Sequence, residues 1–142
     1  MLAVVNEKIH PVRDVAKTST FGQEAFRSPF GQLDYVLEGS ARFYRSVARS
    51  HTVSSQWNID DIDVLSEVGI IYSHGGTDSK TVDCMLDSGV RSIVYAATGH
   101  GNMAHSVTES PVAARARDIH VVRASRTGSG IVIRNAAQPD GP

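Results

Sequence analysis

The pattern of hydrophobic and polar residues differs between the first and the second part of the chain. Near its start, the apolar run at residues 2–5 predicts a buried strand, and two semi-alternating runs within 33–45 predict a β-hairpin around a turn at 38–40. Residues 51–57 are mostly small or polar and have no periodicity, which predicts a linker. We therefore expect one folded region over 1–50 and a second over 58–142.

Beyond the linker, strand patterns alternate with helix patterns. The sequence predicts strands at 68–73, 92–97 and 119–122, and helices at 78–87 and 103–117. Val82, Met85 and Leu86 fall at i, i+3 and i+4 and predict the apolar face of the first helix, with Cys84 also in the core. Pro111 should make the second helix start late or kink. This alternation predicts parallel βαβ units, and so an α/β fold.

Composition narrows the possible classes of protein. At 142 residues, the chain is long enough for one domain or for parts of two. A net charge of −1 gives no reason to expect nucleic acid or an anionic membrane as a partner. Cys84 is the only cysteine, which excludes an intrachain disulfide and a metal site built from cysteines.

The turn after the second predicted parallel strand is a candidate ligand loop. Residues 99–104 match the pattern G-x-G-x-x-A, and open α/β sheets place ligands at the carboxyl ends of strands. A dinucleotide site also needs an acidic residue at the end of the next strand, where this chain has Arg123 and Arg126. Arginines would suit a 2′-phosphate, so an NADP-binding Rossmann unit is one alternative. His100 is a candidate general base without an identifiable partner.

Two other polar segments carry candidate chemistry. Residues 75–78 could form an anion-binding nest, although we favour a strand-to-helix turn with a helix cap. Lys17 lies among three hydroxyl residues and could accept a proton if burial lowered its pKa; the alternative is a solvated loop.

Several segments follow one another in an order that is similar to a known family. These are RDVAKTST, FRSPFGQLDYV, GIIYSHGGTDS, IVYAATGHGN, VVRASRTGSG and RNAAQPDG. Along essentially its whole length the chain resembles bacterial L-asparaginases and glutaminase-asparaginases. The resemblance implies that residues 1–50 end a doubly wound N-terminal domain, and that 58–142 form a smaller, Rossmann-like parallel α/β C-terminal domain that is truncated.

The resemblance also implies site residues. Lys17 matches the family's active-site lysine, which assists proton transfer. Asn102 matches an asparagine that reaches into a neighbouring subunit's site and holds the substrate's α-amino end. The position of the family's glutamate is occupied by Ala137, and Asp140 is the nearest acid. The two nucleophilic threonines, in Thr-Gly-Gly-Thr-Ile and Thr-Asp-Thr stretches, have no counterpart in this sequence.

The activity implied is hydrolysis of the side-chain amide of L-asparagine, or of L-glutamine, to the acid and ammonia, without a cofactor. A homotetramer is implied for the full-length form, in the periplasm or cytoplasm of a bacterium, with no nucleic acid or membrane as partner. Because both threonines are missing, we expect the chain alone to be inactive. A non-catalytic interface module from a truncated gene is a further alternative.

Overall fold

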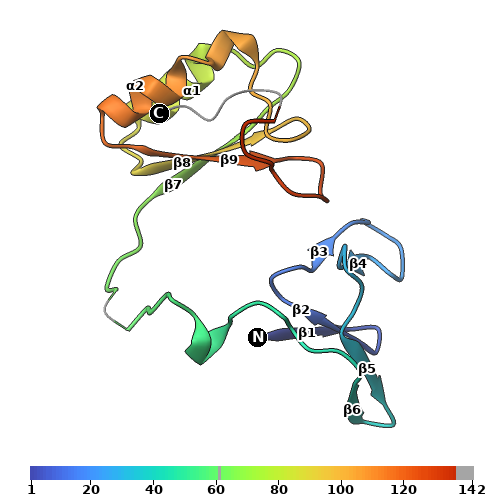
Figure 1. The fold of residues 1–142 in the computed structure, drawn as a ribbon. Coiled ribbons are helices and arrows are strands. Elements are labelled where there is room, and N and C mark those ends of the chain that lie inside the picture. Colours follow the sequence, from blue (N-terminus) through green and yellow to red (C-terminus); the bar gives the residue numbers. More distant parts are fainter. Residues whose placement is uncertain (61, 137–142) are drawn as a thin grey trace. The chain divides into compact units, whose positions relative to one another are not determined.

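A computed structural model describes residues 1–60 and 62–136, so Ala137 and Asp140 lie outside the described residues. The chain divides into two compact units, residues 1–61 and 62–142 (Figure 1). The predicted linker, residues 51–57, falls in the first unit, where Thr52–Ser54 form a short 3-10 helix, η1.

The first unit is built from antiparallel strands. Four of them form a sheet in the order β1-β2-β5-β6, and β3 and β4 form a separate pair. Their bounds are β1 Leu2–Val5, β2 Lys8–Pro11, β3 Ala16–Lys17, β4 Phe26–Arg27, β5 Asp34–Leu37 and β6 Ser40–Phe43. The predicted hairpin is confirmed as β5–β6. The described part of this unit contains no α-helix, so it does not by itself confirm that residues 1–50 end a doubly wound domain.

Two tight turns set the register of this sheet. Asn6 and Glu7 connect β1 to β2 with φ of 48° and 62°, and Glu38 and Gly39 connect β5 to β6 with φ of 50° and 74°. Positive φ at both central residues is typical of type I′ turns, whose twist matches that of the strands they join. Each turn therefore fixes one hairpin.

The strand predicted at residues 2–5 is present, but its predicted burial is wrong. Leu2 and Val4 of β1 are 43% and 57% exposed. β1 is the edge strand of the sheet, and among the described residues only β2 pairs with it. Burial is instead concentrated on β2 and β5, where the paired residues Ile9 and Asp34 are each 1% exposed.

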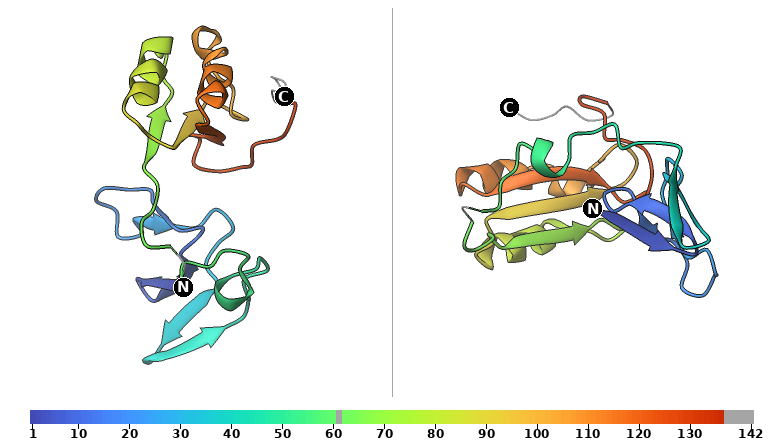
Figure 2. Two further views of the ribbon diagram at one scale, coloured as in Figure 1. Left: turned by 90° about the vertical axis from the view of Figure 1, so that its left-hand side faces the viewer. Right: turned by 90° about the horizontal axis from the view of Figure 1, so that it is seen from below.

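The second unit is a parallel sheet with two helices on one face (Figures 1 and 2). The sheet has the order β7-β8-β9, and its middle strand is paired in parallel on both sides. The bounds are β7 Val68–Tyr72, α1 Ser79–Asp87, β8 Ser92–Ala97, η2 His105–Val107, α2 Ser110–Ala116 and β9 His120–Ser125. These elements confirm the predicted strand–helix alternation and the mixed α/β class.

The core lies between this sheet and its helices. The largest fully buried side chains here are Ile93 and Tyr95 of β8, which pack with Val82 and Leu86 of α1. The prediction that Cys84 lies in the core is wrong, because this residue is exposed on the other side of α1.

The second helix is shorter than predicted. The expected helix over 103–117 begins only at Ser110, after η2, and Pro111 lies in its first turn. Proline is tolerated there because the first backbone N–H groups of a helix have no partner inside the helix. The late start foreseen from Pro111 is therefore confirmed.

Candidate functional site

The loop after β8 folds back on its own first residue. The backbone N–H groups of Gly101 and Asn102 both donate to the carbonyl of Thr98, at 3.0 and 2.8 Å. Gly99 and Gly101 have φ of 52° and 84°, a region that glycine adopts without steric cost. The two glycines thus close a compact loop at the carboxyl edge of the parallel sheet, with Asn102 at its end.

Asn102 presents its side chain from this loop. The residue is half-buried, and a Cβ added to Gly99 would lie 3.4 Å from its Nδ2 atom. Within the described residues, its side-chain amide makes no hydrogen bond, although its backbone is fully engaged with Thr98. An amide offers both donors and an acceptor, so the side chain of Asn102 can take part in recognition of a polar ligand.

Gly101 is held in place by Arg123 of β9. A Cβ at position 101 would lie 2.7 Å from Cγ and 3.1 Å from Cδ of Arg123. The arginine stem therefore packs directly over the glycine backbone, which leaves no space for a side chain. A glycine is therefore required at this position of the loop that carries Asn102, both for its φ and for its contact with Arg123.

The last residue of β9 and the residue after it form hydrogen bonds with neighbouring segments at the same edge of the sheet. Ser125 Oγ donates to the carbonyl of Gly99 at 2.5 Å, and Arg126 Nη1 donates to the carbonyl of Ser73 at 2.6 Å. Tyr72 Oη donates to the carbonyl of Arg126 at 3.2 Å, and the guanidinium lies 5.9 Å from the centre of the Tyr72 ring. Sequence reasoning missed this network, because its partners are far apart in the chain.

The dinucleotide alternative does not fit this loop. A pyrophosphate is bound at a helix N-terminus that directly follows the glycine turn. Here Asn102 pairs back with Thr98, and the first residue of α2 is Ser110. His100 Nδ1 lies 3.2 Å from the carbonyl of Ile131, so its partner is backbone rather than an acid.

Residues 75–78 form the predicted strand-to-helix turn. The backbone N–H of Thr77 donates to the carbonyl of His74 at 3.1 Å, and that of Gly76 to His74 Nδ1 at 3.1 Å. Thr77 Oγ1 accepts from the backbone N–H of His74, and Asp78 is the N-cap of α1. These N–H groups are used within the turn and are not available to an anion.

Lys17 lies in the first unit, on β3, where it pairs with Phe26 of β4. The lysine is exposed, and its ammonium group makes no ion pair or hydrogen bond within the described residues. The neighbouring Thr18 hydroxyl donates to the carbonyl of Ala25 at 3.3 Å. This unit therefore presents the ammonium group but does not supply the burial that a proton-accepting lysine requires.

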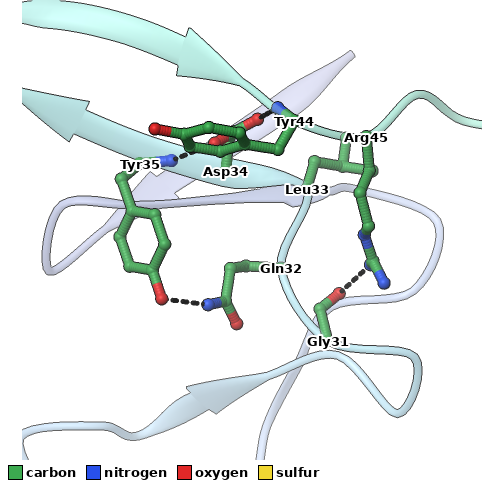
Figure 3. Close-up of a pocket in the computed structure, with 7 residues that line it drawn as sticks. All are labelled: Gly31, Gln32, Leu33, Asp34, Tyr35, Tyr44 and Arg45. Carbon is green, nitrogen blue, oxygen red and sulfur yellow. Dashed lines mark hydrogen bonds between the residues drawn. The ribbon is translucent and has the colours of Figure 1, made fainter.

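A cavity of about 280 Å³ lies beside β5, and it contains neither Lys17 nor Asn102 (Figure 3). Buried Asp34 accepts hydrogen bonds at this cavity from the backbone N–H groups of Tyr35 and Tyr44. Arg45 donates to the carbonyl of Gly31 at 3.3 Å. Asp34 and Arg45 therefore already have hydrogen-bond partners within the protein. The sequence did not predict this cavity.

Residues 1–60 and 62–136 contain neither a cluster of metal ligands nor a membrane-spanning helix. No group of three or more His, Cys, Asp or Glu side chains there could hold a metal ion. Of the helices in those ranges, none combines the length and apolar character needed to cross a membrane.

Residues 67–141 match the family model of the Glutaminase/Asparaginase C-terminal domain. The chain belongs to the glutaminase/asparaginase family. This result confirms the resemblance inferred from the ordered segments, and the match spans β7 through β9, including the loop that carries Asn102.

Relatives extend the similarity over 99% of the chain. It is 34% identical to a glutaminase-asparaginase of Pseudomonas fluorescens, 32% to a probable periplasmic L-asparaginase of Haemophilus influenzae and 31% to L-asparaginase 2 of Escherichia coli. The chain covers 39%, 40% and 40% of these proteins. It therefore spans about two-fifths of their length.

Proposed function

We propose that this chain is the part of an amidohydrolase that positions the substrate and assists proton transfer during hydrolysis of the side-chain amide of L-asparagine or L-glutamine. The observation that carries the proposal is the loop at 98–102. It holds Asn102 half-buried and leaves its amide without a partner among the described residues. The names of the relatives supply the substrate class.

Each unit contributes one polar group to this function. Asn102 binds the α-amino end of a substrate in a neighbouring subunit, where its amide oxygen accepts from the ammonium. Lys17 assists proton transfer at a nucleophilic threonine, and further parts of the full-length enzyme bury its ammonium group. Burial disfavours the charged form of a lysine and makes it a better proton acceptor at neutral pH.

Ala137 weakens substrate binding. A carboxylate at this position would accept a charge-assisted hydrogen bond from the substrate ammonium, which is worth about 1.5–3 kcal/mol. Alanine provides none of it. A full-length enzyme with alanine here is therefore expected to have a higher KM for amino-acid substrates than one with glutamate.

The wider assembly follows the family pattern. Residues 1–50 belong to a doubly wound N-terminal domain, 51–57 form a linker, and 58–142 belong to the C-terminal domain. The full-length enzyme is a homotetramer that needs no cofactor and acts in the periplasm or cytoplasm of a bacterium. Support for the periplasm comes from the relative of Haemophilus influenzae, which is named a periplasmic enzyme.

The isolated 142-residue chain tests the proposal. Because it contains neither threonine stretch, we expect its ammonia release from L-asparagine to equal that of a Lys17→Ala variant. Ammonia release above that of the variant would mean that this chain has a nucleophile of its own, which contradicts the proposal.

A further inference from the structure

A second cavity of the first unit is lined by two arginines, a tryptophan and small polar residues. Its volume is about 410 Å³, and its lining residues are Arg13, Ala48, Arg49, Ser50, Ser55, Gln56 and Trp57. Pockets for small organic ligands have volumes of about 300–1,000 Å³. The cavity is an open depression, because six of its seven lining residues are exposed, but its volume lies within this range, and it contains neither Lys17 nor Asn102.

The residues that line this cavity carry positive charge and no negative charge. Arg13 and Arg49 make no ion pair or hydrogen bond within the described residues, and no acidic residue is among the lining residues. Asp14 follows Arg13 in the chain but forms no ion pair with it. Two arginines without an acidic partner give this cavity a positive charge, which favours the binding of an anion. Their planar forks match carboxylate and phosphate oxygens.

Trp57 adds an apolar surface to the same cavity. The indole is 78% exposed. The turn before it is fixed by a hydrogen bond in which the backbone N–H of Trp57 donates to Ser55 Oγ at 3.1 Å. Large exposed aromatic side chains offer stacking area at little cost in conformational entropy.

We propose that this cavity binds a small organic oxyanion, in which a carboxylate or phosphate group contacts Arg13 and Arg49 and a planar ring stacks on Trp57. The site is independent of the amidohydrolase chemistry, because it uses other residues. Ser50 and Gln56 provide further hydrogen-bonding groups at its rim.

Trp57 is the only tryptophan of the chain, so its fluorescence reports on this cavity directly. The 142-residue chain is titrated with inorganic phosphate, phenyl phosphate and benzoate at constant ionic strength. We expect a saturable change, with phenyl phosphate binding more tightly than inorganic phosphate because its ring stacks on the indole. Comparison of phenyl phosphate with benzoate tells which anionic group the arginines prefer.

Three variants decide whether the arginines form the site. Arg13→Gln and Arg49→Gln should each weaken binding about tenfold, the loss expected for one charge-assisted contact. Arg42→Gln is the matched control, because Arg42 is also exposed in the first unit but does not line the cavity. Absence of saturable binding of all three anions would overturn the proposal. An equal effect of Arg42→Gln and Arg49→Gln would also overturn it, because binding would then depend on general surface charge.

Discussion

Replacement of Gly101 by alanine should destabilise the second unit more than the same change at another glycine with positive φ. Gly89, which follows α1, is the matched control. Its φ is 88°, close to the 84° of Gly101, but no atom lies within 4 Å of a Cβ added at position 89. The two variants therefore share the backbone strain and differ in the contact with Arg123.

The expected magnitudes follow from this geometry. Gly89→Ala should cost about 1 kcal/mol, because left-handed strain is partly offset by the lower entropy of the unfolded chain. Gly101→Ala adds overpacking against Arg123, which raises the total cost to about 2–4 kcal/mol. The clash involves Cγ and Cδ of the arginine, close to the backbone of β9, so rotation of the guanidinium alone does not relieve it.

Urea unfolding followed by far-ultraviolet circular dichroism measures these free energies. Among the described residues, α1 and α2 are the α-helices, and both belong to the second unit. In an Arg123→Ala background, the cost of Gly101→Ala should fall to that of Gly89→Ala. Equal costs of the two glycine variants in the native background, or an excess that persists without the Arg123 side chain, would refute the packing argument.

Three further changes have expected outcomes. Ile93→Ala removes a side chain that is 1% exposed in the core, so unfolding of the second unit by urea should become easier by about 2–5 kcal/mol. Asp34→Ala removes the acceptor of two backbone N–H groups, that of Tyr35 in β5 and that of Tyr44 just after β6. Amide hydrogen exchange in β5 should then show a loss of about 1–3 kcal/mol in the free energy of unfolding. The hydrogen bond and charge of Lys8 lower the pKa of Glu24 below its ordinary value. This pair therefore stabilises the fold above the unfolded-state pKa of Glu24, and its contribution is lost as pH falls through the folded-state pKa. An NMR titration should show a lowered midpoint for Glu24 that Lys8→Met raises toward the ordinary value.

Local patterns were sufficient for some elements and not for others. The β5–β6 hairpin was predictable because Gly39 marks its turn, whereas the β1–β2 hairpin turns on Asn6 and Glu7 and has no glycine. Cys84 was misplaced because it is apolar and lies next to the buried face of α1. On a helix of about 3.6 residues per turn, neighbouring residues point in different directions. Which residues of α1 are buried therefore depends on their position around the helix and not on their hydrophobicity alone.

The candidate site could also be predicted only in part from local sequence patterns. Asn102 was identified from the order of short segments, and its loop geometry agrees with the predicted glycine turn at the end of β8. The contact between Gly101 and Arg123 could not be predicted, because it joins residues from different elements through tertiary packing.

The central claim is that this chain supplies the supporting residues of an amidohydrolase whose nucleophiles lie elsewhere in the full-length enzyme. It is tested most directly by ammonia release from a chimera, in which this chain replaces the matching segment of the Pseudomonas fluorescens relative. We predict turnover of L-asparagine that Lys17→Ala reduces about 100-fold or more, as for loss of an acid–base group. Lys80→Ala, which removes an exposed lysine from α1, should have no effect. A folded chimera without turnover, or with equal rates for the two lysine variants, would contradict the claim.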